Sequence, residues 1–359
     1  MLATEPQSTG GNRAAWLSWF GRHALRAARV IGQFVLALWA TLAVYYSNLP
    51  WPWLRLLLAA AFAVFSVWAL WLTRRPRMRL VFVGLLVAVI AWEVSIPPSH
   101  DRPWRPEAAV MPRAVVDGDR VRLIGVRDFS YRSTRYDFTE RYIEREVFLS
   151  HLTSVDFFLS YWGGRDGGPV AHTFLSFNFD NAAPVSISIE ARPEKGEGFD
   201  PLGSLFKQFE LIYVVGEERD LVGVRTTQRR EAVYLYPIRA PPASVRRLFL
   251  IYMQRINQLA DHPEWYSLLK SNCTLNIVRY ARAAGWAAGF DLRQYLNGWA
   301  DRYLYAAGLL NTALPFDELR ARSRIIDIVG PQEEDVYAFS RRIRSTLPVD
   351  PTRPNVVNK

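Results

Sequence analysis

The chain has 359 residues, a formal net charge of +10 and a sequence pI of about 9.8. The charge is unevenly distributed, because residues 1–100 hold nine arginines, no lysine and two glutamates, a net of +7. The remaining residues carry only +3 and contain no basic stripe with interleaved aromatic residues. This distribution argues against a nucleic-acid-binding protein despite the high pI.

Apolar residues are concentrated in three runs within the first hundred residues: Val30 to Tyr46, Leu54 to Leu72 and Leu80 to Ile96. Each is close to the ~20 residues that a helix rising ~1.5 Å per residue needs to cross the hydrocarbon core of a bilayer. Tryptophans lie near the ends of these runs. A single such run could be a buried core helix, but three in succession favour a membrane anchor over residues 30–96, and a cleaved signal peptide fits poorly.

The arginines indicate the orientation of this anchor. Four precede the first run (Arg13, Arg22, Arg26, Arg29), and four lie between the second and third (Arg74, Arg75, Arg77, Arg79). The loop from Ser47 to Trp53 carries no charge. By the positive-inside rule, residues 1–29 are expected in the cytoplasm and the chain emerges on the other side after the third run.

The exported part begins with a proline-rich, polar linker at residues 97–112 and ends with a polar tail at 347–359. Between them, residues 113–346 are expected to form an α+β domain. Alternating patterns and turn residues predict extended segments at Ala114–Val126, Glu144–Leu149, Ser154–Tyr161, Val170–Phe179, Val185–Arg192, Leu221–Thr226 and Ala232–Pro237. Leu205–Val215 is expected to be a helix running into a strand. Further helices are predicted at Pro242–Leu259, Asn272–Ala284, Asp291–Leu310 and Pro331–Thr346.

Cys273, the one cysteine of the chain, lies in the exported domain. Taken alone, a single cysteine is more often a small buried apolar residue than a reactive thiol. Here, however, it follows Ser271 and Asn272, both good helix N-caps, which places it in the first turn of a helix. Unpaired backbone N–H groups and the helix dipole at that position favour the thiolate, the form that attacks carbonyl carbon.

A cysteine nucleophile also needs a base, and His172 is the strongest candidate among the five histidines. It begins a predicted strand after a glycine-rich loop, which would place it at a sheet edge or cleft rim. If the following hairpin turns around Asn181, then His172 lies opposite Glu190 and on the same face. A carboxylate there could fix the imidazole tautomer, as the third member of a catalytic triad does.

Each of these residues also has an ordinary structural interpretation. His172 could be a half-buried histidine without chemistry, and Glu190 and Arg192 could form a surface ion pair. The charged run at residues 217–220 is expected to be a solvated turn. The dispersed histidines offer no zinc spacing, and there is no serine nucleophile elbow or phosphate loop, so neither a metal nor a cofactor is expected.

Several longer motifs resemble the Lnb-type N-terminal periplasmic domain family, over about Arg102 to Ile326. They are Ser154–Ser160, Ala171–Phe177, Ser188–Arg192, Phe209–Val215 and Ser271–Asn276. The resemblance implies a circularly permuted papain-like cysteine fold in which histidine precedes cysteine, a layout similar to the lecithin retinol acyltransferase group. This chain matches that layout at His172, the histidine that begins an upstream strand, and at the Asn272-Cys273 pair, which opens a helix. Within the motifs, Asn272, Asn276, Ser176 and Arg192 are the expected supporting or binding residues.

The resemblance also implies lipoprotein N-acylation at the bacterial inner membrane. The expected activity is a cysteine acyltransferase that moves an acyl chain from a phospholipid to an amine, such as a lipoprotein N-terminus, through a thioester on Cys273. A periplasmic cysteine hydrolase acting on peptide or peptidoglycan amides is the alternative, and a non-catalytic, membrane-tethered binding module is a third possibility. An apolar channel that opens toward the membrane would favour acyl transfer, and a polar, groove-like cleft would favour peptidoglycan hydrolysis. A cysteine sealed from solvent would favour neither activity. The oligomeric state stays open.

The arginine asymmetry predicts that everything after Pro97 lies outside the cytoplasm. Alkaline phosphatase, which is active only after export, should therefore be active when fused after residue 110 and inactive when fused within the arginine-rich loop at residues 74–79. An inactive fusion after residue 110 would overturn this topology.

Overall fold

The computed structural model describes residues 10–132, 134, 136–162, 166–286, 289, 291–325 and 335–348, with side chains described from residue 21 onward. The chain divides into two compact units. One comprises Met1–Pro97 together with Phe206–Gln208, and the other comprises Pro98–Leu205 and Phe209–Lys359.

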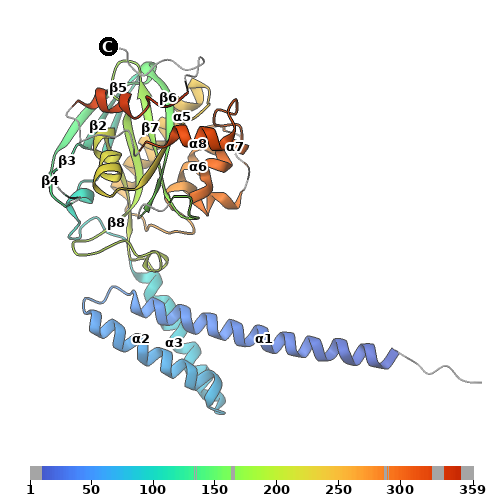
Figure 1. Ribbon diagram of the computed structural model, residues 1–359. Coiled ribbons are helices and arrows are strands. Elements are labelled where there is room, and N and C mark those ends of the chain that lie inside the picture. The colour runs from blue at the N-terminus through green and yellow to red at the C-terminus, as the bar shows by residue number, and fades with distance from the viewer. Residues whose placement is uncertain are drawn as a thin grey trace, which may run out of the picture. The chain divides into compact units, whose positions relative to one another are not determined.

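The first unit is built from three long helices, drawn in blue shades in Figure 1. They are α1 (Gly10–Tyr45), α2 (Pro52–Val67, extended by a π-helical turn at Trp68–Leu72) and α3 (Pro76–Ser95). Proline at the start of α2 and α3 supplies the φ angle of a first helical turn and lacks an N–H group that would need a partner. The spans Gly21–Tyr45, Pro52–Leu72 and Pro76–Ser95 are long and apolar enough to cross a membrane, which confirms the prediction of three apolar helices.

A short piece of the chain between β8 and β9 also belongs to this first unit. The ring of Phe206 stacks on Tyr46 at a centroid distance of 5.6 Å. The Nζ of Lys207 donates to the carbonyl oxygens of Glu93 at 2.6 Å and Ile96 at 3.3 Å. These carbonyls lie at the end of α3, and the last carbonyl groups of a helix have no N–H partners within it. Lys207 therefore supplies hydrogen-bond donors to the end of α3.

The second unit is organised around one mixed sheet. Its strands are β1 (Arg113–Asp117), β2 (Arg120–Arg127), β5 (Tyr142–Phe148), β6 (Leu152–Tyr161), β7 (His172–Phe179), β8 (Val185–Arg192), β9 (Glu210–Glu217) and β10 (Ala232–Pro237). They run in the order β1-β2-β9-β8-β7-β6-β10, with β5 also paired to β2. All neighbours are antiparallel except β2 and β9. A separate small hairpin joins β3 (Ser130–Tyr131) and β4 (Phe138–Thr139).

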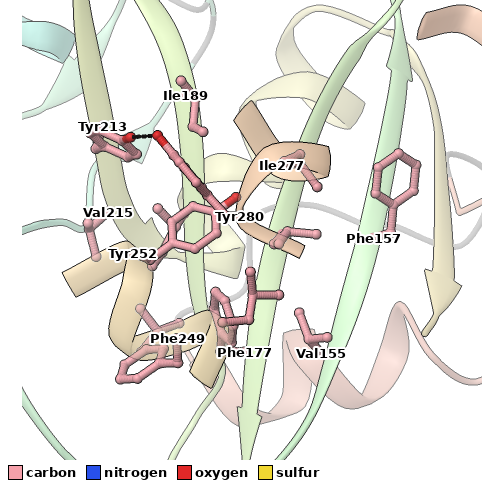
Figure 2. Packing of buried hydrophobic residues seen from close by; sticks show 14 of the residues in the cluster. Val155, Phe157, Phe177, Ile189, Tyr213, Val215, Phe249, Tyr252, Ile277 and Tyr280 are labelled. Atoms are coloured by element: carbon pink, nitrogen blue, oxygen red, sulfur yellow. Dashed lines mark hydrogen bonds between the residues drawn. The ribbon is translucent and has the colours of Figure 1, made fainter. Parts of the chain in front are cut away.

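One face of the sheet carries the main apolar core. Alternate side chains of the central strands meet α5 (Pro242–Asp261) and α6 (Cys273–Ala283), as Figure 2 shows for Phe177 beside Phe249 and Tyr252. The hydroxyl groups of Tyr213 on β9 and Tyr280 on α6 are 2.5 Å apart. This bond gives two buried hydroxyls a partner and fixes α6 over β9.

The opposite face, here called the polar face, buries polar side chains beside a second apolar cluster that includes Phe158 and Phe174. Asp156, Ser176 and Asn178 line it on β6 and β7, and α4 (Glu218–Leu221) and α9 (Val336–Arg342) pack nearby. Arg344 donates to the carboxylates of Asp156 and Glu218. Buried carboxylates on this face are thus paired with a guanidinium, which offsets the cost of removing both from water.

The charged run at residues 217–220 is therefore not the expected solvated turn. All four side chains are buried and paired: Glu217 with Arg145, Glu218 with Arg344, Arg219 with Asp128 and Asp220 with Arg127. Composition alone could not distinguish the two outcomes, because the four partners come from distant parts of the chain.

Most predicted strands and helices are present, with several differences. Leu221–Thr226 is helical rather than extended, continuing α4 into a π-helical turn at Val224–Gln228. Its β-branched residues are buried here by tertiary packing, which outweighs their local preference for strands. Asp291–Leu310 is divided into short 3-10 turns at Leu292–Gln294 and Asn297–Trp299 and α7 (Ala300–Ala306).

The remaining differences lie around the sheet and near the end of the chain. A 3-10 turn at Gly203–Leu205 replaces the helix expected before β9. Helix α8 (Phe316–Ser323) was not predicted, and of the segment predicted as helical at Pro331–Thr346, the described residues after Arg342 lie outside α9. Residues 326–334 and most of the tail predicted at 347–359 lie outside the described part of the chain.

The segment expected as a linker, residues 97–112, is largely structured against the domain. Arg192, at the end of β8, donates to the carbonyl oxygens of Ala108 and Ala109, both at 2.8 Å. Its guanidinium also stacks over the Trp104 ring at 4.1 Å. These contacts bury Arg192, so it is not part of a surface ion pair with Glu190.

The Asp220 ion pair generates a stability prediction. Asp220 is fully buried and accepts from Arg127 Nε and Nη2, both at 2.9 Å, and from the Phe129 N–H at 2.8 Å. Asp220→Ala should lower the free energy of unfolding by about 3–5 kcal/mol, because it leaves Arg127 buried without a counter-ion. Denaturant unfolding of the detergent-solubilised protein measures this.

The matched control is Asp117→Ala, which removes a carboxylate from the exposed pair with Arg120. It should change stability little, because solvent screens exposed ion pairs. Equal effects of the two substitutions would contradict the structural role of the buried pair.

Candidate active site

Cys273 is the first residue of α6, as the capping pattern predicted. The side chain of Asn272 accepts a hydrogen bond from the Leu275 N–H at 2.8 Å, and its Nδ2 donates to the Leu268 carbonyl at 2.6 Å. Asn272 thus caps the helix and ties its start to the preceding turn. Cys273 itself is 3 % exposed.

His172 is the first residue of β7 and contacts the Cys273 thiol. Burial raises the pKa of this thiol, but the neighbouring His172, by its charge and by a hydrogen bond, lowers it to about 6. Hydrogen bonds from the Thr173 backbone and side chain act in the same direction. The two residues that the sequence predicted as nucleophile and base are therefore in contact, and the surroundings favour an ionised sulfur.

Ser188 connects His172 to the predicted carboxylate. His172 Nε2 lies 2.7 Å from Ser188 Oγ, which in turn donates to Glu190 Oε1 at 2.7 Å. The direct separation between His172 Nε2 and Glu190 Oε1 is 3.7 Å. The hairpin of β7 and β8 has the predicted register, with Phe174 opposite Ser188, so His172 and Glu190 share a face. Since Nε2 engages Ser188, Nδ1 is the ring nitrogen left for the thiol.

Arg225 holds Glu190 in place. Its Nη2 donates to Glu190 Oε1 at 2.7 Å, its Nη1 donates to the Leu221 carbonyl, and its guanidinium lies 4.8 Å from the centre of the Phe174 ring. Burial would raise the pKa of Glu190, but Arg225 and then His172 hold that pKa well below its usual range. Glu190 is consequently an anion at neutral pH and can stabilise an imidazolium through Ser188.

Asn297 is a further neighbour of the sulfur that the sequence did not reveal. Its Nδ2 lies 3.7 Å from Cys273 Sγ, and its Oδ1 accepts from the Ala171 N–H at 2.8 Å. Ser188 could have been inferred from its i, i+2 spacing to Glu190 on one strand face. Arg225 and Asn297 carried no such local signal, since they lie in a π-helical turn and a 3-10 turn that the sequence did not predict.

The other predicted supporting residues have different surroundings. Ser176 Oγ donates to Glu218 on the polar face of the sheet. Asn276 Oδ1 accepts from Arg279, and its Nδ2 is buried with no hydrogen-bond partner among the described residues. Arg192 binds the segment around Ala108, as described above. Of the four, only Asn272 directly shapes the start of the cysteine helix.

His151 is not an alternative base. It precedes β6 and contacts Asp180 at 2.6 Å. Because Ser160 pairs with His172 and Leu152 with Phe179, His151 and His172 lie at opposite ends of the β6–β7 pair. At roughly 3.3 Å per residue, that separation is about 25 Å.

The fold and the site define a membrane-associated protein whose α/β domain carries a buried cysteine–histidine pair. Residues 138–301 match the family model described as the Lnb N-terminal periplasmic domain, which confirms the predicted resemblance to that family. The matched segment contains Cys273, His172, Glu190 and Asn297. Comparisons with curated proteins and with solved structures each found no match.

The Cys273 surroundings generate a prediction about its ionisation. The thiolate should form with a midpoint near pH 6, and His172→Ala should shift that midpoint upward, because the burial effect then acts with less opposition. Because the chain has one cysteine, the difference in thiolate ultraviolet absorbance between the parent and Cys273→Ser reports this group alone. A parent midpoint near 9, unchanged by His172→Ala, would contradict the contact.

Proposed function

We propose that this protein is a membrane-anchored periplasmic cysteine acyltransferase, which moves an acyl chain from a phospholipid to an amine such as a lipoprotein N-terminus. The observation that carries the proposal is the contact between Cys273 and His172, with the pKa of the thiol lowered to about 6. Such a pair generates a nucleophile without a metal or cofactor. The order of the pair, histidine before cysteine, is the one expected of a circularly permuted papain-like fold.

In the proposed first half-reaction, His172 takes the proton of the Cys273 thiol and the sulfur attacks the ester carbonyl carbon. The resulting oxyanion meets the N–H groups at the start of α6, which have no acceptor within the helix. The ester C–O bond then breaks, and His172 returns the proton to the departing oxygen of the lysophospholipid. The products are a thioester on Cys273 and a lysophospholipid alcohol.

In the second half-reaction, the acceptor amine attacks the thioester carbonyl. His172 removes a proton from the amine nitrogen, the C–S bond breaks, and the proton returns to the sulfur. The amide leaves and the thiol is restored. In both halves Ser188 and the Glu190 anion would hold the imidazole and stabilise its charged form.

The anchor favours a lipid donor over the alternatives. Three helices long and apolar enough to span a membrane are covalently joined to the domain, which would keep it near phospholipid at high effective concentration. A cysteine hydrolase acting on peptide or peptidoglycan amides would use the same residues. The 3 % exposure of Cys273 counts equally against both activities, so either substrate requires an opening of the surrounding loops.

The proposed reaction predicts that Cys273→Ser reduces acyl transfer by several orders of magnitude while folding is retained, because a serine hydroxyl does not readily form an anion. His172→Ala should be comparably impaired, and the two losses should not add, since nucleophile and base act together. Glu190→Gln should cost less. The assay follows labelled acyl chains from phospholipid into an amide on a diacylated lipopeptide with a free amino terminus.

The controls separate the candidate functions. Asp180→Asn, beside the remote His151, should transfer label at the parent rate. Transfer by Cys273→Ser at the parent rate would refute the mechanism. Release of free fatty acid without amide would identify a lipid hydrolase, and cleavage of peptidoglycan fragments would favour the amide hydrolase.

A further inference from the structure

We propose that Asn297 is a catalytic residue of this site, whose side-chain N–H stabilises the oxyanion formed when Cys273 attacks an acyl group. The inference rests on the proposed acyl chemistry at Cys273, without depending on which acyl donor or acceptor is used. Asn297 lies in the 3-10 turn Asn297–Trp299, 24 residues after the cysteine. It is buried, and its Nδ2 is 3.7 Å from Cys273 Sγ.

The orientation of the Asn297 amide is determined by a second contact. Its Oδ1 accepts from the backbone N–H of Ala171, the residue immediately before His172, at 2.8 Å. An N–H donor requires the oxygen on that side, so the amide presents its NH₂ group to the sulfur. One side chain therefore links the cysteine to the strand that carries the base.

The backbone around Asn297 is also held closely against the loop before His172. Gly298 N–H donates to the Pro169 carbonyl at 3.1 Å, and the Tyr161 hydroxyl donates to the Gly298 carbonyl. A Cβ at Gly298 would lie 1.9 Å from the Gly168 carbonyl oxygen, so only glycine fits there. This close approach positions Asn297 with little freedom to turn away from the sulfur.

An oxyanion site needs donors that converge beside the attacking atom. The backbone N–H of Cys273 is one, because it opens α6 and has no acceptor within that helix. Asn297 Nδ2 reaches the same sulfur from a separate turn and is the second. In other acyl-transfer enzymes, loss of one such donor lowers kcat by about 10²–10³-fold.

Asn297→Asp is the decisive variant, since it has nearly the same shape and retains the oxygen that accepts from Ala171. It replaces the NH₂ group beside the sulfur with a carboxylate oxygen. The formation of the Cys273 thioester is followed in a single turnover with a p-nitrophenyl ester, which needs neither the natural donor nor the acceptor. We expect acylation to slow by about 10²–10³-fold with an unchanged melting temperature. The thiolate midpoint should also rise, because a negative charge replaces a donor.

Asn311→Asp is the matched control, the same exchange at a residue whose Oδ1 accepts from Arg239 and from the Ala313 N–H. It should acylate at the parent rate. Acylation of Asn297→Asp at the parent rate would overturn the inference, as would a parent protein that no activated ester acylates. A parent that forms the thioester but does not transfer it from phospholipid to an amine would refute the proposed transferase while leaving the role of Asn297 intact.

Discussion

The ion pair between the buried Arg225 and the partly buried Glu190 is the interaction on which the site depends. Glu190 must remain charged in a partly buried position if it is to act on His172 through Ser188, and a guanidinium at 2.7 Å makes that possible. Arg225 is itself held by a main-chain carbonyl and by the Phe174 ring. Without this pairing, burial would favour a neutral carboxyl group, which stabilises an imidazolium far less well.

The same compensation operates across the polar face of the sheet. Arg344 pairs with the carboxylates of Asp156 and Glu218, and Arg127 pairs with that of Asp220. Apolar side chains would cover such a face at lower desolvation cost, so these pairs are weak evidence for high stability. Their consequence is geometric: charged partners accept few alternative arrangements, and the strand β8, which bears Ser188 and Glu190, is held at a defined position beneath α4.

Successive side chains of β7 point to opposite faces of the sheet, so Thr173 and His172 have different neighbours. Thr173 faces α6, where its hydroxyl lies 2.8 Å from that of Thr274, whereas His172 shares the other face with Ser188 and Glu190. Helix α6, with Cys273, packs on the main apolar face of the sheet, whereas His172 lies on the opposite face. They can meet because His172 is the first residue of its strand, at the end of the sheet, where a side chain can reach past the backbone edge.

Local patterns in the sequence determined much of this protein. Long apolar runs specify three helices, the Ser271-Asn272 cap specifies where α6 begins, and the alternation in β7 and β8 with a turn around Asn181 specifies the register that brings His172 near Glu190. Each of these signals lies within a few turns or one hairpin. Tertiary structure alone decided the rest. The charged run at 217–220 is buried, and Arg225 and Asn297 reach the site from a π-helical turn and a 3-10 turn. Their roles depend on partners tens of residues away, so no local period or capping rule could identify them.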